Sequence, residues 1–300
     1  MTKMKKAAGF FALFLSLSAG APGQTGPPST DIFVADLKGR AGSLTVGVPV
    51  NITSREGYDN QPMFLRGGER LLYTSIREDG QADIYRYDLK SGSSSKVTDT
   101  KESEYSATVT PDGKSFSVIR VEADSTQRLW KFPLAGGEPE LVLKSIKPVG
   151  YHAWLDGQTL VLFILGEPST LQLVDARSEK AEIIARNVGR SIHRLEGAGR
   201  VSFVQKESER DWVIKQLDVK TRKIATVAKT LPGSEDYAWT PGGSLLMAKE
   251  SKLYEWKPGR DTAWREVADF SAQGIRGITR LAVSPSGNRL ALVAASGAKP

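Results

Sequence analysis

The stretch Ala107-Thr-Val-Thr-Pro-Asp-Gly-Lys-Ser-Phe-Ser-Val-Ile119 decides the fold. Two apolar segments flank its centre, where proline presets the first corner of a turn and glycine adopts positive φ. The stretch therefore predicts a β-hairpin whose tip lies at Gly113. The same chemistry recurs at three further places in the chain: Trp154-Leu-Asp-Gly157, Trp239-Thr-Pro-Gly-Gly243 and Val283-Ser-Pro-Ser-Gly287.

The hairpin belongs to a repeat. Aligning the chain on the turn glycine gives steps of 45, 44, 42, 44 and 44 residues between six positions: Gly68, Gly113, Gly157, Gly199, Gly243 and Gly287. Self-similarity at this period is typical of propeller blades with four strands each. We therefore predict an all-β protein, a six-bladed β-propeller of four-stranded antiparallel blades.

The first strand indicates how the ring closes. Asp31-Ile-Phe-Val-Ala-Asp-Leu-Lys38 matches Asp83-Ile-Tyr-Arg-Tyr-Asp-Leu-Lys90, which follows an inner hairpin and reads as the third strand of a blade. The first of these segments precedes every inner hairpin, and the last hairpin has no outer strands after it. We expect the N-terminal strands to complete the last blade, which removes an exposed sheet edge.

Residues 1–24 have the pattern of a secretory signal peptide and leader. Lys3, Lys5 and Lys6 precede an apolar run over 7–17, and small residues follow. A membrane anchor is the alternative, but the run is shorter than the ~20 residues that span a bilayer. The sequence predicts export to the periplasm or the exterior, no membrane span after cleavage, and one propeller domain over residues 25–300.

Composition excludes several classes of protein. Without residues 1–24 the formal charge falls from +7 to +4, and a mildly basic surface of mixed charge does not indicate nucleic-acid binding. The chain has no cysteine, so disulfides, thiolate metal sites and a cysteine nucleophile are ruled out.

The unit Thr110-Pro-Asp-Gly-Lys114, and more weakly Pro62-Met-Phe-Leu-Arg-Gly-Gly68, resembles the TolB-like or WD40-like propeller repeat of bacterial exported proteins. The resemblance covers about residues 31–294 and implies the fold, whereas the functions of that family are diverse. TolB places an α/β domain before its propeller, for which we expect no room here. Peptidase relatives carry a Gly-x-Ser-x-Gly motif, which this chain lacks.

Candidate binding residues lie where each blade enters its innermost strand, because the loops on one rim of a rigid ring are the usual place for a site. They are Asp59, Asn60, Glu104, Tyr105, Tyr151, His152, His193, Glu235, Asp236, Tyr237 and Arg280. Asp59 and Glu104 each lie nine residues before a turn glycine, so adjacent blades should present carboxylates at equivalent height.

Two metal hypotheses arise from these residues. With a one-residue deletion before Asp156, His152 and His193 fall on the same blade position, which makes a shared transition-metal site one interpretation and ordinary packing between blades the preferred one. The carboxylates could converge on the axis and hold calcium, although solvated rim charges explain them as well. We therefore assign no cofactor and no metal ligand, and keep calcium as the alternative.

Two function classes remain open. The preferred one is a monomeric, non-catalytic binding scaffold that holds a protein, peptide or glycan on one face of the ring, since no nucleophile, base and orienting group recur at a recognisable spacing. The alternative is an enzyme similar to the metal-dependent six-bladed hydrolases and lactonases. That class needs acid and amide ligands at the centre, and Asn60 is the only amide among the candidates.

Overall fold

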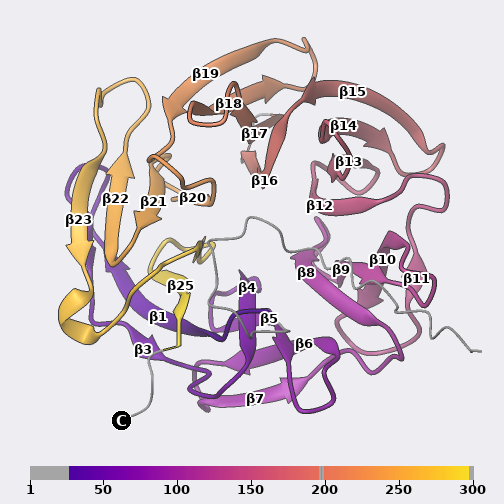
Figure 1. Cartoon of the computed structure of the whole chain (residues 1–300), viewed down its shortest axis with the longest axis horizontal. Helices are drawn as coiled ribbons and strands as arrows, with labels where there is room; N and C mark the ends of the chain where they lie inside the picture. Colours follow the sequence, from indigo (N-terminus) through magenta and orange to yellow (C-terminus); the bar gives the residue numbers. More distant parts are fainter. Residues whose placement is uncertain (1–26, 196, 198, 297–300) are drawn as a thin grey trace, which may run out of the picture.

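The computed structural model describes residues 27–296 except 196 and 198, so the predicted signal peptide lies outside the described residues. The strands are arranged in a ring (Figure 1). Among the described residues, no helix has the length and apolarity that a membrane span requires. The single helical element there is one short 3-10 turn, η1 (Ser271–Gln273).

Five consecutive units each contain four antiparallel strands, in chain order from the centre of the ring outward. The first two units are β4 (Tyr58–Phe64), β5 (Arg70–Ile76), β6 (Ala82–Asp88) and β7 (Ser93–Lys96), then β8 (Ser103–Val109), β9 (Ser115–Val121), β10 (Gln127–Pro133) and β11 (Glu140–Leu141). The next two are β12 (Val149–Trp154), β13 (Thr159–Ile164), β14 (Thr170–Asp175) and β15 (Lys180–Arg186), then β16 (Val188–Leu195), β17 (Arg200–Lys206), β18 (Trp212–Asp218) and β19 (Ile224–Lys229). The fifth is β20 (Tyr237–Trp239), β21 (Leu245–Lys249), β22 (Lys252–Trp256) and β23 (Arg265–Asp269).

The sixth unit joins the two ends of the chain, as the sequence predicts. β24 (Arg280–Val283) pairs with β25 (Arg289–Ala295), and β25 pairs with β1 (Thr30–Lys38) over a register that runs from Thr30 opposite Ala295 to Asp36 opposite Arg289. β2 (Thr45–Val46) and β3 (Val50–Asn51) then pair with the outer side of β1. The N-terminal strands therefore complete the last blade.

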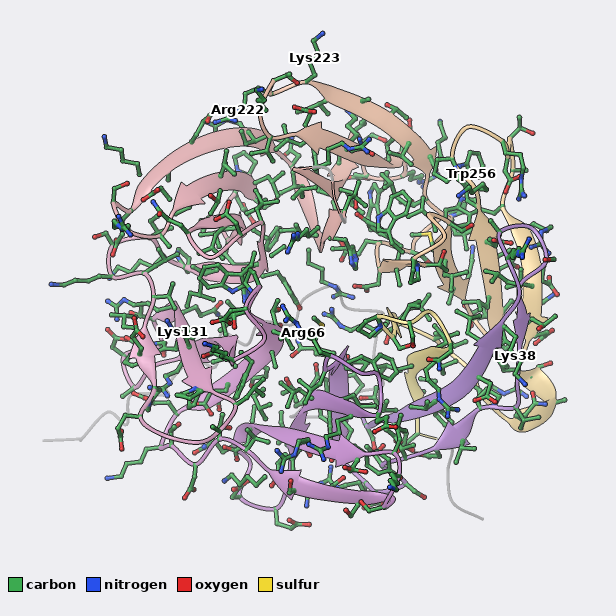
Figure 2. The ribbon with its side chains drawn as sticks, turned by 180° about the vertical axis from the view of Figure 1, so that it is seen from behind. Lys38, Arg66, Lys131, Arg222, Lys223 and Trp256 are labelled. Carbon is green, nitrogen blue, oxygen red and sulfur yellow. The ribbon has the colours of Figure 1, made fainter. Side chains whose placement is uncertain are left out.

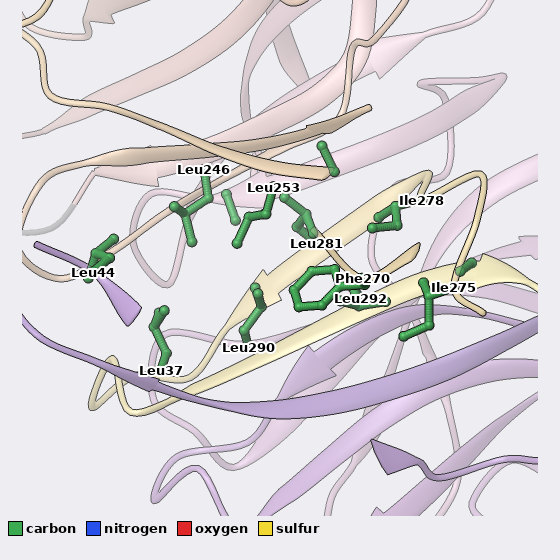
Figure 3. Close-up of a cluster of buried hydrophobic side chains, with 13 residues drawn as sticks. Leu37, Leu44, Leu246, Leu253, Phe270, Ile275, Ile278, Leu281, Leu290 and Leu292 are labelled. Carbon is green, nitrogen blue, oxygen red and sulfur yellow. The ribbon is translucent and has the colours of Figure 1, made fainter. Parts of the chain in front are cut away.

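The hydrophobic core is divided among the junctions between blades. The described residues contain six buried clusters, and each cluster draws its side chains from two neighbouring units of the ring. In Figure 3 the junction of the fifth and sixth units brings Leu246 and Leu253 against Leu290 and Leu292. Leu37 from β1 joins this cluster, so the N-terminal strand is held by apolar packing as well as by pairing. Six such junctions fit the predicted six-bladed ring.

The hairpin tips follow the predicted turn chemistry with one exception. Gly113 has φ +71° and donates its N–H to the Thr110 carbonyl at 2.8 Å, as the turn requires. Gly157 does not have positive φ, so the prediction is wrong there. This turn is tighter: Asp156 Oδ1 accepts hydrogen bonds from the backbone N–H groups of Gln158 and Thr159 at 2.8 and 2.7 Å. The aspartate side chain takes over the role of the left-handed glycine.

Candidate functional site

The innermost strands β4, β8, β12, β16 and β24, with the start of β20, surround a central cavity of about 470 Å³. Six of the predicted site residues line it: Tyr151, His152, His193, Asp236, Tyr237 and Arg280. Turn residues such as Pro111 and Pro285 also contribute to the lining. The cavity therefore extends from the entry ends of the inner strands toward the hairpin tips.

A second cavity of about 610 Å³ adjoins the first on the hairpin-tip side. The two share Met63, His193, Arg194 and Pro285, and the second continues to the turn around Pro241. The hairpin-tip face of the ring is therefore hollowed around its centre.

The other predicted site residues do not line the central cavity. Asp59 and Glu104 do occupy equivalent positions in adjacent blades, opposite Ser75 and Arg120, but both are fully buried. Each has its own cation, because Asp59 lies 3.1 Å from Arg55 and Glu104 lies 3.1 Å from Arg120.

Three further candidates, Asn60, Tyr105 and Glu235, also lie outside the cavity lining. The Asn60 side-chain oxygen accepts the N–H of Gln61 at 2.7 Å, and Tyr105 belongs to β8 without contributing to the lining. Glu235 lies 3.2 Å from Lys206 and 3.4 Å from Arg190.

Asp236 is the centre of an ionic network inside the ring. Its carboxylate lies 2.5 Å from the Arg190 guanidinium and 3.5 Å from that of Arg280. Burial acts to raise the pKa of Asp236, but the two guanidinium groups outweigh it and hold the pKa below its ordinary value. Arg280 also donates to the Tyr151 hydroxyl at 2.7 Å, so residues of four blades are joined in one network.

The two histidines do not occupy the same blade position, which corrects the alignment made from the sequence. His152 Nε2 lies 2.6 Å from Ser117 Oγ in the preceding blade, and Tyr237 makes the equivalent contact of 2.9 Å with Ser202 Oγ. His193 instead pairs with Ser202 across its own hairpin. The two histidines therefore differ by one residue in their position along the inner strand. Because adjacent residues of a strand face opposite sides, the two side chains point toward different neighbours.

The rings themselves confirm this difference. His193 packs against Tyr237 of the following blade with ring centroids 4.5 Å apart, whereas His152 contacts the preceding blade. Burial lowers the pKa of His152 to about 3 and that of His193 to about 4, so both imidazoles are neutral near pH 7. Packing between blades, the preferred interpretation from the sequence, accounts for both side chains.

The geometry also bears on the calcium hypothesis. The carboxylates of Asp59, Glu104, Glu235 and Asp236 each lie beside a basic side chain, and the last two share Arg190. Within residues 27–195, 197 and 199–296, no group of three or more His, Cys, Asp or Glu side chains is arranged to hold a metal ion.

Sequence reasoning missed most of the residues that line the cavity, including the polar side chains Gln61, Arg66, Ser106, Arg190 and Arg194. Figure 2 shows Arg66 near the middle of the ring. Gln61 and Ser106 are 45 residues apart, one repeat length, and could have been paired by aligning the repeat one residue beyond Asn60. Arg190 precedes the most irregular hairpin, so the repeat gives no signal for it.

Comparison with known proteins supports the fold. No protein-family model matches the chain, and no curated protein matches its sequence. Among solved structures, one assigned as TolB from Agrobacterium tumefaciens has a TM-score of 0.70 at 15% identity, covering 91% of this chain and all of the other. TolB from Acinetobacter baumannii has a TM-score of 0.58 at 15% identity, and the match covers 89% of this chain and 64% of that protein. The chain has a TolB-like β-propeller fold.

A third similar structure belongs to a different functional class. An oligogalacturonate lyase in complex with manganese has a TM-score of 0.54 at 16% identity, with 92% of this chain and 81% of the lyase covered. At these identities the likeness extends to the fold alone. The function of the chain must therefore be argued from its own cavity.

Proposed function

We propose that this chain is an exported, non-catalytic propeller scaffold that binds a protein, peptide or glycan partner at the hairpin-tip mouth of the two adjoining cavities, which we together call the central channel. The observation that carries the proposal is the network of Tyr151, Arg190, Asp236 and Arg280, which draws on four blades and lines the same cavity that reaches the hairpin tips. A surface whose side chains are already held in place loses little conformational entropy on binding.

The composition of the channel supports recognition over catalysis. Arginine and tyrosine are the residue types that most often anchor a partner, and both occur around this cavity. Asp236, the one carboxylate that lines this cavity, is paired with the guanidinium groups of Arg190 and Arg280, which hold its pKa below the ordinary value. The two cavities on the hairpin-tip side favour that face as the place of contact.

Partner capture tests the proposal. The mature chain is immobilised and exposed to a cell-envelope extract, and captured components are compared between the wild type and Arg194→Glu, an exposed residue that lines both cavities. Lys223→Glu is the matched control, because Lys223 lies at the outer edge of the ring (Figure 2). A partner lost with Arg194→Glu and kept with Lys223→Glu supports the scaffold; equal capture by all three proteins contradicts it.

The location and the alternative activity have their own tests. Sequencing the N-terminus of the mature protein from the envelope should find a start near residue 25, whereas an intact Met1 in the membrane fraction would show an anchor. For the enzyme alternative, manganese, calcium and zinc are added to the purified chain and its melting temperature is measured with and without a chelator. A large rise that the chelator reverses would favour the metal-dependent enzyme over the scaffold.

A further inference from the structure

The lining of the central channel contains more arginines than carboxylates, although Asp236 and the neighbouring Glu235 partly compensate Arg190 and Arg280. Four arginines and one carboxylate face the first cavity: Arg66, Arg190, Arg194, Arg280 and Asp236. The second cavity adds Arg200 and no acidic residue. Asp112, Asp156 and Asp218 lie near Arg66, Arg194 and Arg200 respectively, but none of these aspartates lines either cavity.

Gln61 lines the first cavity, and its buried side-chain amide has a fixed orientation. Its side-chain oxygen accepts the Ser106 backbone N–H at 2.7 Å and the Thr74 hydroxyl at 2.8 Å. A backbone N–H can only donate, so the atom facing it must be the oxygen, and the amide cannot be flipped. The Nε2 group of Gln61 is therefore a donor, and it has no hydrogen-bond partner among the described residues.

Ser106 lies beside it in the next blade and has the same character. Its hydroxyl is buried and has no hydrogen-bond partner among the described residues. Gln61 is 6% exposed and Ser106 9%, so leaving these groups unpaired costs free energy. Both residues line the first cavity.

The backbone at these two positions is strained in the same way. Gln61 has φ +58° and Ser106 φ +57°, each at a bulge in an innermost strand. Among the described residues they are the only buried non-glycine residues with positive φ. Left-handed conformations of such residues cost free energy and cluster at ligand sites. The inner strands of two consecutive blades therefore have the same backbone irregularity at the cavity wall.

We propose that the channel binds a small oxyanion, a carboxylate or phosphate group, through the Gln61 amide, the Ser106 hydroxyl and the guanidinium groups of the lining. Each of these groups can donate a hydrogen bond to an anionic oxygen, and a cavity of about 470 Å³ has the size of a small-molecule site. This inference goes beyond the proposed function, since it concerns a ligand inside the channel and needs no partner protein.

The test uses the purified mature chain with inorganic phosphate, citrate and uncharged glycerol, each at constant ionic strength. The melting temperature and calorimetric titration report binding. We expect a saturable rise in melting temperature with phosphate or citrate and none with glycerol. A response to phosphate alone identifies a phosphate ligand, and a response to citrate alone identifies a carboxylate. No response to either anion overturns the proposal.

Two variants locate the site. Ser106→Gly deletes the hydroxyl and relieves the left-handed backbone, so it should fold well and bind roughly tenfold more weakly. Ser125→Gly is the matched control, because Ser125 is exposed in the same blade with φ +67°. Gln61→Glu keeps both accepted hydrogen bonds but replaces the donor by an anionic oxygen, and should abolish binding. Unchanged affinity in Ser106→Gly and Gln61→Glu would overturn the proposal.

The outcome separates this inference from the proposed scaffold. If the wild-type protein captures a partner but binds no oxyanion, the proposed scaffold is supported and the proposed channel ligand is contradicted. Oxyanion binding that depends on Gln61 and Ser106, without any partner capture, would support the channel ligand and contradict the scaffold.

Discussion

The guanidinium of Arg280 donates a hydrogen bond of 2.7 Å to the hydroxyl of Tyr151, although 129 residues separate the two in the chain. Arg280 begins β24 and Tyr151 lies in β12, on opposite sides of the ring (Figure 1). The guanidinium also lies over the tyrosine ring, 5.1 Å from its centroid. This contact ties the two halves of the propeller together across the channel.

Tyr151→Phe should lower the free energy of unfolding by about 1 kcal/mol, the usual net contribution of one hydrogen bond. The ring and its contact with the Arg280 guanidinium remain, and Arg280 still pairs with Asp236. Urea unfolding followed by tryptophan fluorescence measures the change. An unchanged midpoint would show that the contact across the channel contributes nothing to stability.

Asp236→Asn should be more damaging, with a loss of about 3–5 kcal/mol, because it leaves the guanidinium groups of Arg190 and Arg280 without their shared carboxylate. Removing one of the two cations as well, in the double variant Asp236→Asn with Arg280→Met, should recover part of the loss. Urea unfolding of the two single variants and the double variant gives the coupling energy. Strictly additive losses would contradict the network.

Ser202→Ala should destabilise the junction between the fourth and fifth blades by about 2 kcal/mol. Ser202 Oγ accepts hydrogen bonds from Tyr237 at 2.9 Å and from Trp239 at 2.8 Å, and both donors would lose their acceptor. The same change in a Tyr237→Phe background should cost less, because one donor is already gone. Ser117→Ala tests the repeat, since Ser117 contacts His152 and Trp154 in the same way.

The stability of the protein should depend on the protonation of Glu104. Burial raises the pKa of this carboxyl to about 7 in spite of its contacts with Thr100 and Arg120. The folded protein then holds a proton that the unfolded chain releases near pH 4.5, so this group makes stability fall as the pH rises from 4.5 to 7. At its steepest the loss is about 1.4 kcal/mol per pH unit.

Glu104→Gln should flatten this part of the stability curve. Urea midpoints measured at intervals from pH 4.5 to 8 give the slopes for wild type and variant. Glu102→Gln is the control, because Glu102 lies 3.4 Å from the same Arg120 guanidinium and its side chain is 29% exposed. A variant slope equal to that of the wild type would mean that Glu104 is ionised throughout this range.

Ring closure can be tested by truncation. Removing residues 1–53 deletes β1, β2 and β3 and leaves β25 as an exposed edge strand. Exposed edges pair with other chains, so this protein should aggregate or lose cooperative unfolding. Removing residues 1–26 keeps the whole of β1 and is the control. Size-exclusion chromatography and urea unfolding report the outcome, and a soluble monomer with an unchanged midpoint would contradict the closure.

The repeat in the sequence was sufficient to predict the strands, the hairpins and the closed ring. A turn such as Thr110-Pro-Asp-Gly-Lys114 depends on local backbone preferences, and period-two patterns mark the strands on either side of it. The match between Asp31–Lys38 and the third strand of a blade predicted that the two termini share a sheet, and the pairing of β1 with β25 confirms it. The strands and turns depend on neighbours in the chain, and the repeat extended them to the pairing of the two ends.

The arrangement of the site depended on the tertiary structure. Adjacent residues of a strand face opposite sides, and the inner strands of both histidines contain bulges that the spacing does not reveal, so His152 and His193 face different blades although their sequence positions align closely. Spacing alone could not indicate that Arg280 reaches Tyr151 or that Gln61 meets Ser106. Local sequence determines strands and turns through backbone sterics, whereas charges and donors from separate blades meet only after hydrophobic packing has closed the ring.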